Sequence, residues 1–315
     1  MKQTKKLGRG LEDFSHLFLS SPSDAKKPLP DPPQGSLEHK KVVGAPSRSL
    51  CVVSHRALDQ RAFLVIHLAL EIAQQGKKVL LLDGDFSMPR LTMRMQDCIA
   101  TPLSHLITRH GRDLRDVQET NGVKLISLDV DLSTLSALGQ DERRSLKDSF
   151  NTLEEESDVI LTVASPGFMH HMKALVCAVD EAMVITPQPL AEMINAYGLI
   201  KLIFHMRENV RVGIVSCNLT NALQAAMVFE KMKRVVDKFL HKPLVNYGFI
   251  PDGGEIVAPQ KTGDHRSPQT FSHNFTSVTE IIRTIFEMDP GNDCALYKDS
   301  IAPGFSEKLF APSRH

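Results

Sequence analysis

The sequence lacks several features that would place a protein quickly in a functional class. Its 37 Lys and Arg residues balance 37 Asp and Glu residues, so its overall charge does not indicate a nucleic-acid partner. It has no run of about 18 apolar residues, and the basic start MKQTKKLGRGLEDF lacks the apolar core of a signal peptide. We therefore expect a cytoplasmic protein whose contact with a membrane is at most peripheral.

Cysteine is scarce, and its spacing does not suit a metal. No CxxC pair occurs, and His67, His170 and His171 do not form a spaced ligand set, so we predict no metal site and interpret these histidines as structural. The cysteines are widely scattered and are expected to be reduced, mostly buried thiols: Cys51, Cys98, Cys177, Cys217 and Cys294.

The chain divides into four segments. Residues 1–20 have apolar positions at helical spacing behind several lysines, which indicates a basic amphipathic peptide. Residues 21–48 are rich in proline and are predicted to be a linker. Residues 49–288 form the folded domain, and residues 289–315, rich in Pro, Gly and Ser, are expected to be a flexible tail.

The folded domain is predicted to be α/β, with a mostly parallel sheet and helices on both faces. Its strand-like runs are continuously apolar, as in strands that are covered on both sides. The predicted strands are SLCVVS, KKVLLLD, VKLISLD, DVILTVA, EAMVITP, RVGIVSC and VNYGFIP. Helical patterns lie between most of them, at residues 62–75, 141–156, 190–205 and 222–241.

Glycine is missing where the pattern most needs it. Residues 52–85 have the outline of a phosphate-binding unit: a strand, a loop, an apolar helix, and a second strand that ends in Asp-Gly-Asp. The loop, SHRALDQRA, contains no glycine. A phosphate nest turns several backbone N–H groups inward, and ordinary residues adopt the required conformations at a cost of about 1–2 kcal/mol each. The loop is therefore poorly suited to holding a phosphate.

Several landmarks follow one another along the domain: QQGKKVLLLDGDF, TPLSHLITRHGRDLRDVQETNGVKLISLD, LSALGQDERRSLKDSFNTLEEESDVILTVASPGF, DEAMVITPQPLAEMINAYGLIKLI and YGFIPDGGEIVAPQKTG. In order and spacing they resemble the MinD/ParA family of deviant Walker ATPases, most closely its FlhG/FleN (YlxH) flagellar-number-regulator branch. The likeness covers roughly residues 49–288. It implies a P-loop NTPase fold.

The resemblance also assigns the positions of the family's nucleotide site. An ungapped match to the family's S-G-K-G-G-V-G-K-T-T loop places Arg56 at the signature lysine, Arg61 at the Walker lysine and Ala62 at the magnesium-binding hydroxyl residue. Val163 falls on the Walker B aspartate, so an apolar side chain stands where a carboxylate supports the metal shell. Both halves of the site are therefore changed.

Three polar residues of the family pattern are retained. Asp83 and Asp85 match the D-x-D pair, and Asn218 matches an adenine-contacting asparagine. Without the loop, the two aspartates are also explained as strand-end carboxylates that hydrogen-bond the turn, and Asn218 as a polar residue at a strand end. Arg56 could reach a partner's ligand as the family's signature lysine does, but alone such a residue is more often a surface cation.

We interpret the chain as a MinD/ParA-like pseudo-ATPase that acts through protein partners and has no cofactor. The alternative is an ATPase with an atypical loop that uses Arg61, Asp83 and Asp85, in which case ATP and Mg²⁺ would bind. A relative of the capsule-export tyrosine kinases is a weaker alternative, because those kinases need a C-terminal tyrosine cluster and this tail holds only Tyr297.

The N-terminal peptide is the candidate partner-binding element. LGRGL within it looks like the basic box by which ParB-type proteins engage ParA-type ATPases, and the residues concerned are Leu7, Gly8, Arg9, Gly10, Leu11 and Phe14. The resemblance implies a ParA/MinD-type ATPase or a flagellar or polar assembly protein as partner, with a location at a cell pole, and leaves a homodimer open. An unstructured leader is the other reading of this peptide.

Overall fold

The computed structural model describes residues 47–55, 59–85, 89–95, 97–108, 117–131, 135, 137–167, 169–251, 272–287 and 303–310. The predicted N-terminal peptide and almost all of the linker lie outside these residues. No helix among the described residues is long and apolar enough to cross a membrane.

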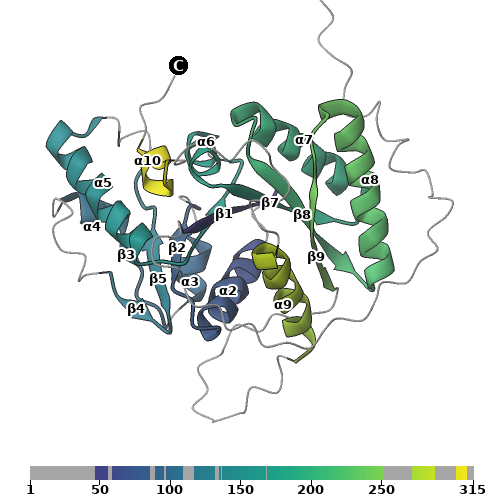
Figure 1. Ribbon diagram of the computed structural model, residues 1–315, viewed down its shortest axis with the longest axis horizontal. Coiled ribbons are helices and arrows are strands. Elements are labelled where there is room, and N and C mark those ends of the chain that lie inside the picture. Colours follow the sequence, from purple (N-terminus) through teal and green to yellow (C-terminus); the bar gives the residue numbers. More distant parts are fainter. Residues whose placement is uncertain are drawn as a thin grey trace, which may run out of the picture.

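A single sheet organises the described part of the chain, with its strands in the order β3-β5-β2-β6-β1-β7-β8-β9 and β4 paired to β5 (Figure 1). Every described pairing is parallel except that of β4 with β5. The strands are β1 (Arg48–Val53), β2 (Val79–Asp83), β3 (Thr101–Pro102), β4 (Glu119–Thr120), β5 (Val123–Ser127), β6 (Val159–Ala164), β7 (Glu181–Pro187), β8 (Arg211–Leu219) and β9 (Val245–Pro251). This confirms the predicted fold class and all seven predicted strands.

The central strands are buried along almost their whole length, which explains their continuously apolar sequences. In β1, Leu50 and Val52 point into one hydrophobic cluster while Cys51 and Val53 point into another. Each cluster fills the space between one face of the sheet and its helices. The alternation of side chains along a strand therefore serves two cores instead of separating core from solvent.

Helices cover both faces of the sheet (Figure 1). One face packs against α2 (Asp59–Gln74), α3 (Arg90–Arg94) and α9 (Ser272–Glu287). The opposite face packs against α4 (Leu103–Thr108), α5 (Gln140–Glu155), α6 (Met169–Ala178), α7 (Leu190–Met206) and α8 (Ala222–Leu240). The four predicted helices correspond to α2, α5, α7 and α8.

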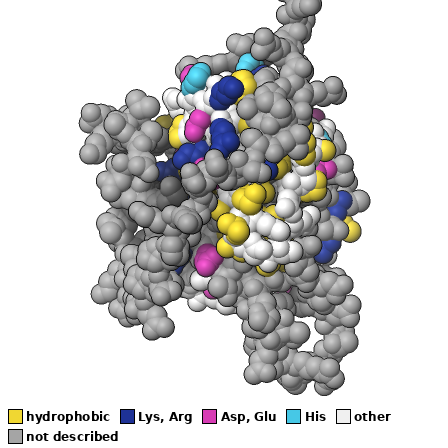
Figure 2. All heavy atoms as spheres, turned by 90° about the vertical axis from the view of Figure 1, so that its right-hand side faces the viewer, with side chains coloured by type: hydrophobic (Ala, Val, Ile, Leu, Met, Phe, Trp, Pro, Cys, Tyr) yellow, Lys and Arg dark blue, Asp and Glu magenta, His cyan; other side chains and the backbone are white. Residues whose placement is uncertain are grey.

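The surface on the side of α8 and β9 carries charges of both signs. Figure 2 shows lysine and arginine side chains beside acidic ones, with apolar side chains grouped next to them. In α8 the exposed residues include Lys233, Arg234 and Lys238 together with Glu230 and Asp237. This helix therefore presents a mixed, solvated face.

The prediction of a flexible tail is wrong for residues 303–310. They include the short helix α10 (Phe305–Leu309), which packs against α5 and α6 and buries Phe305. The sequence pattern misses this helix because its stabilisation comes from Glu154, which binds the backbone N–H groups of Phe305 and Ser306 from α5. Residues 288–302 and 311–315 lie outside the described part of the chain.

Candidate functional site

The candidate site lies where the carboxyl ends of β1, β2 and β6 meet. These three strands are neighbours in the sheet, with β6 between β2 and β1. In an open parallel sheet, loops at this edge form the usual ligand site. The N-terminal end of α2 and the Asp83–Asp85 turn both reach the same edge. The structure thus places Arg61, Asp83 and Asp85 at the same edge of the sheet.

Arg61 points into the protein, and its side chain is completely buried. One guanidinium nitrogen, Nη1, donates to the carbonyl oxygen of Ala164 at 2.7 Å. The other, Nη2, forms an ion pair with the Asp85 carboxylate. The residue aligned with the Walker lysine is therefore bound to the ends of β2 and β6. Breaking a buried pair of this kind on one side costs about 3–5 kcal/mol, so a phosphate would have to compete with that interaction.

The two positions aligned with magnesium-binding residues lie in the apolar core. Ala62 is 2% exposed and Val163 is 1% exposed, and both belong to the cluster beneath α2. Val163 pairs with Val52 of β1 and with Asp83 of β2. Neither side chain offers an oxygen, so these positions cannot position metal-bound water.

Asp83 is bound by the chain segment that follows it. Its Oδ2 accepts hydrogen bonds from the backbone N–H of Thr92, at 2.9 Å, and from the Thr92 hydroxyl, at 3.0 Å. Burial raises the pKa of the Asp83 carboxyl above its usual range, although the hydrogen bonds from Thr92 oppose the rise. Asp83 is thus a strand-end carboxylate that fixes the start of α3. Thr92 is not among the predicted site residues, and only its position after the D-x-D turn could have suggested it.

Gly84 allows the turn between the two aspartates to pack closely on β6. A Cβ atom at this position would lie 2.1 Å from the Val163 carbonyl oxygen and 2.5 Å from Leu175 Cδ1. The first of these atoms is backbone and cannot move aside. Only glycine fits between β6 and α6, and this close packing places Asp85 against Arg61.

The remaining predicted site residues do not join this cluster. Asn218 is exposed at the end of β8, with a left-handed backbone angle φ of 59°. Arg56 lies outside the described residues, as do Leu7, Gly8, Arg9, Gly10, Leu11 and Phe14. His171, interpreted as structural, is buried at the start of α6, where its Nε2 lies 3.2 Å from Asp131 Oδ1.

The described residues do not contain a group of three or more His, Cys, Asp or Glu side chains that could hold a metal ion. The four cysteines in the described part of the chain are free, and Cys51 and Cys217 are buried. Burial raises the pKa of the Cys51 thiol to about 12, although the nearby Arg61 charge opposes the rise. Cys51 therefore stays protonated beneath the Arg61–Asp85 pair.

Exposed apolar side chains lie around this edge of the sheet. Met93 on α3 is 61% exposed and Leu223 at the start of α8 is 65% exposed. Met169, at the start of α6, is 43% exposed. Each follows the carboxyl end of a strand, β2, β8 or β6. The described part of this edge thus has a buried Arg61–Asp85 pair and exposed apolar side chains.

Solved structures with the same fold are MinD and ParA-type proteins. The MinC:MinD cell division complex of Aquifex aeolicus matches with a TM-score of 0.54 and 17% identity, over 76% of this chain and 94% of that chain. A plasmid partition protein of Borrelia burgdorferi bound to AMPPNP matches with a TM-score of 0.53 and 13% identity, over 77% and 99%. MinD of Pyrococcus furiosus matches with a TM-score of 0.53 and 14% identity, over 76% of this chain and 99% of that chain. The fold is that of the MinD/ParA P-loop NTPases.

Within that class, the chain is similar in sequence to Antiactivator FleN of Pseudomonas aeruginosa. The two are 24% identical over 189 residues, which is 59% of this chain and 67% of FleN. An uncharacterized ATP-binding protein of Methanocaldococcus jannaschii is 26% identical over 132 residues, 42% of this chain and 50% of that protein. No family model matches. These comparisons confirm the predicted resemblance to the MinD/ParA family and to FleN.

Proposed function

We propose that this protein is a MinD/ParA-like pseudo-ATPase that regulates the number or placement of flagella, or another polar or partitioning system, through protein partners. The observation that carries the proposal is the state of Arg61. Its fully buried guanidinium is bound to Asp85 and to the Ala164 carbonyl. The family's essential cation is thereby engaged by the protein itself.

Two further observations support the loss of hydrolysis. Ala62 and Val163 place core methyl groups where phosphoryl transfer needs metal-positioning oxygens. Phosphoryl transfer depends on positioning and charge stabilisation, so losing both together with the free cation removes the main contributions to the rate. We infer that no cofactor is needed.

Protein partners are supported by the surface and by the relatives. Exposed Met93, Met169 and Leu223 offer apolar contact area at the edge that also carries the closed site. A solved structure with this fold is a complex of MinD with MinC, and a sequence relative is named an antiactivator. We infer that the chain acts in the cytoplasm or at a pole, with a ParA/MinD-type ATPase or a flagellar assembly protein as partner.

The second candidate is an ATPase that binds nucleotide through its atypical loop. It is favoured by one observation, the similarity to a protein named as ATP-binding. Under this reading, ATP and Mg²⁺ would bind beside Arg61, Asp83 and Asp85. The Arg61–Asp85 pair would have to open for that to happen.

Isothermal titration of the full chain with ATP and Mg²⁺, together with a phosphate-release assay, separates the two candidates. We expect no heat of binding at millimolar nucleotide and no turnover. A MinD protein under the same conditions is the positive control. Submillimolar affinity with turnover would establish the ATPase and refute the pseudo-ATPase.

The N-terminal peptide is proposed to bind the partner through Leu7, Gly8, Arg9, Gly10, Leu11 and Phe14. Affinity purification of the intact chain, and of the chain without residues 1–20, followed by mass spectrometry, tests this role. We expect the deletion to lose specific partners. Retention of every partner would show that the peptide is not the binding element.

A further inference from the structure

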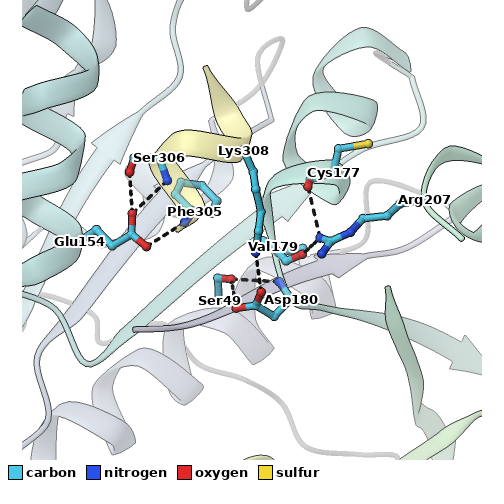
Figure 3. A network of polar contacts seen from close by, with 9 residues as sticks. All are labelled: Ser49, Glu154, Cys177, Val179, Asp180, Arg207, Phe305, Ser306 and Lys308. Carbon is cyan, nitrogen blue, oxygen red and sulfur yellow. Dashed lines mark hydrogen bonds and ion pairs between the residues drawn. The ribbon is translucent and has the colours of Figure 1, made fainter. Parts of the chain in front are cut away.

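The first turn of α10 is bound by the carboxylate of Glu154 on α5 (Figure 3). Glu154 Oε1 accepts the backbone N–H of Phe305 at 2.7 Å, and Oε2 accepts the backbone N–H of Ser306 at 2.9 Å. Oε2 also accepts the Ser306 hydroxyl at 2.7 Å. The carboxylate thus holds the first turn of α10 and selects a hydroxyl residue at its second position.

Side chains of residues 303–310, the C-terminal segment, add apolar and ionic contacts to this attachment. Phe305 is 2% exposed, and the Phe310 ring packs edge-on against Phe150 of α5 with 5.3 Å between the ring centroids. Lys308 Nζ lies 2.7 Å from Asp180 Oδ1 (Figure 3). We call the surface formed by Phe150, Asn151, Glu154 and Asp180 the docking surface.

The docking surface contacts a short pattern of residue types in the C-terminal segment. Phe305, Ser306, Leu309 and Phe310 are buried or half-buried on it, whereas Glu307 is exposed. Ser306, Leu309 and Phe310 lie one, four and five residues after Phe305, so all four share one face of a helical turn. The pattern is therefore Phe-Ser, two variable residues, and then two large apolar residues.

Residues 14–19 repeat this pattern without a gap. They read Phe-Ser-His-Leu-Phe-Leu, and residues 305–310 read Phe-Ser-Glu-Lys-Leu-Phe. The Phe and Ser positions are identical, and the last two positions hold Phe and Leu in exchanged order. The chain thus carries a second peptide of the kind that the docking surface binds.

The N-terminal part of the chain also joins the fold beside this surface. Ser47, where the described part begins, donates its hydroxyl to the Glu154 carbonyl at 2.5 Å and to the Ser157 carbonyl at 2.7 Å. Residues 20–46 connect this point to residues 14–19. A connection of that length spans about 30 Å as a random coil and more where its prolines favour extension, so the peptide can reach Glu154 at a local concentration on the order of millimolar.

We propose that the docking surface is a peptide-binding site with two occupants in this chain, the C-terminal segment and residues 14–19. Residues 14–19 bind as a helical turn when the C-terminal segment leaves. Phe14 takes the place of Phe305, and Ser15 takes that of Ser306 against Glu154. The inference does not involve the nucleotide site, but it uses Phe14, which also belongs to the proposed partner-binding peptide.

Two differences between the peptides set the order of occupancy. Asp13 corresponds to Gly304, where a Cβ atom would lie 2.7 Å from Glu154 Oε1, and its charge would repel that carboxylate. Leu17 corresponds to Lys308 and cannot pair with Asp180. The C-terminal segment is therefore the stronger occupant, and residues 14–19 the weaker one.

Photo-crosslinking in the full chain tests the proposal. p-Benzoylphenylalanine replaces Phe18, which leaves Phe14 and Ser15 intact, and crosslinked residues are identified by mass spectrometry. The unaltered background is compared with Phe305→Ala plus Phe310→Ala, which weakens the C-terminal segment. Glu154→Ala is added to remove the carboxylate, with the exposed neighbour Glu155→Ala as matched control.

We expect crosslinks to α5 or α6, within one chain or between two copies, to increase by roughly tenfold when Phe305 and Phe310 are truncated, because buried aromatic contacts dominate such docking. Glu154→Ala should remove the increase and Glu155→Ala should preserve it. A synthetic peptide of residues 301–313 should suppress the crosslinks. Crosslinks that fall on other elements, or that do not respond to Glu154→Ala, would overturn the proposal.

Circular dichroism establishes that each variant is folded. If the double truncation does not fold, Lys308→Glu replaces it, since this change repels Asp180 and leaves the apolar contacts in place. It should also increase the crosslinks to α5 or α6. An unchanged pattern in that variant would refute exchange between the two peptides.

Discussion

Arg61 is a charged side chain whose partners all lie inside the protein. The guanidinium is fully buried, and it is bound by a carboxylate at one strand end and a carbonyl at another. Arginine suits this role because its planar group donates in several directions and keeps its charge when buried. A lysine reaching the same place would offer a single ammonium. At the position that the resemblance aligns with the Walker lysine, the side chain thus has its partners within the protein.

Removing Arg61 should destabilise the protein strongly. Arg61→Ala leaves the Asp85 carboxylate buried without its partner, and we expect the free energy of unfolding to fall by about 3–5 kcal/mol. The double change Arg61→Met with Asp85→Leu removes both charges and should recover most of the loss. Urea denaturation gives the free energy of unfolding of the unaltered protein, of Arg61→Ala and of the double variant. A loss below about 1 kcal/mol for Arg61→Ala would contradict the buried pair.

His67 on α2 should make the free energy of unfolding depend on pH. Burial lowers its pKa from 6.5 to about 4, so the unfolded chain binds more protons than the folded protein between these two values. The free energy of unfolding should therefore fall as the pH is lowered from 6.5 to about 4. In His67→Gln this contribution disappears. Plots of the free energy of unfolding against pH for the two proteins should therefore differ in slope only in this window. Parallel curves would show that His67 titrates normally.

At the scale of elements, α10 depends on contacts that are remote in sequence. It is only five residues long, too short to be stable by itself. The cap that holds its first turn comes from Glu154, 151 residues earlier in the chain than Phe305. The stability of α10 therefore comes from its contacts with α5 and α6.

Phe305→Ala should weaken this attachment. Truncating a buried phenylalanine costs about 3–5 kcal/mol, and the loss appears in global stability only up to the free energy of docking. We expect faster proteolysis near residue 303 and a lower unfolding midpoint. Glu307→Ala, on the exposed face of the same turn, is the matched control and should change stability by less than about 0.5 kcal/mol. Equal effects of the two changes would show that α10 is not docked through Phe305.

The elements that could be predicted are those with long local patterns. β1, β2 and β5 to β9 were predicted because each is a continuous apolar run, and α2, α5, α7 and α8 because apolar residues recur with helical period. Two longer helices, α6 and the 16-residue α9, were also missed. The two-residue strands β3 and β4 and the short helices α3 and α4 carry too few residues to show a period. Their existence depends on neighbours that a local pattern does not contain.

The same limit explains what could be predicted of the site. The positions of Arg61, Asp83, Asp85 and Val163 followed from a resemblance over many residues. The bond between Arg61 and Asp85 could not be predicted, because it depends on how closely the turn at Gly84 approaches β6. Chemistry at a position can be read from sequence, whereas the partner of a side chain depends on the packing of distant segments.

At the scale of the whole molecule, the described residues form one sheet between two hydrophobic clusters. A ParA-type switch couples nucleotide to assembly, and the proposed closure of the site removes that coupling. We expect the mass measured by light scattering after size-exclusion chromatography to be the same with and without ATP and Mg²⁺. A nucleotide-dependent change in mass would show that the switch is retained.

The attachment at Glu154 also has a mechanical consequence. Its carbonyl binds Ser47 and its carboxylate binds residues 305 and 306, so both ends of the described domain are fastened to one turn of α5. A force pulling these two ends apart would load that turn first and leave the hydrogen bonds of the central strands unloaded. Under tension the domain should therefore release its ends in a separate, early step while the sheet stays folded.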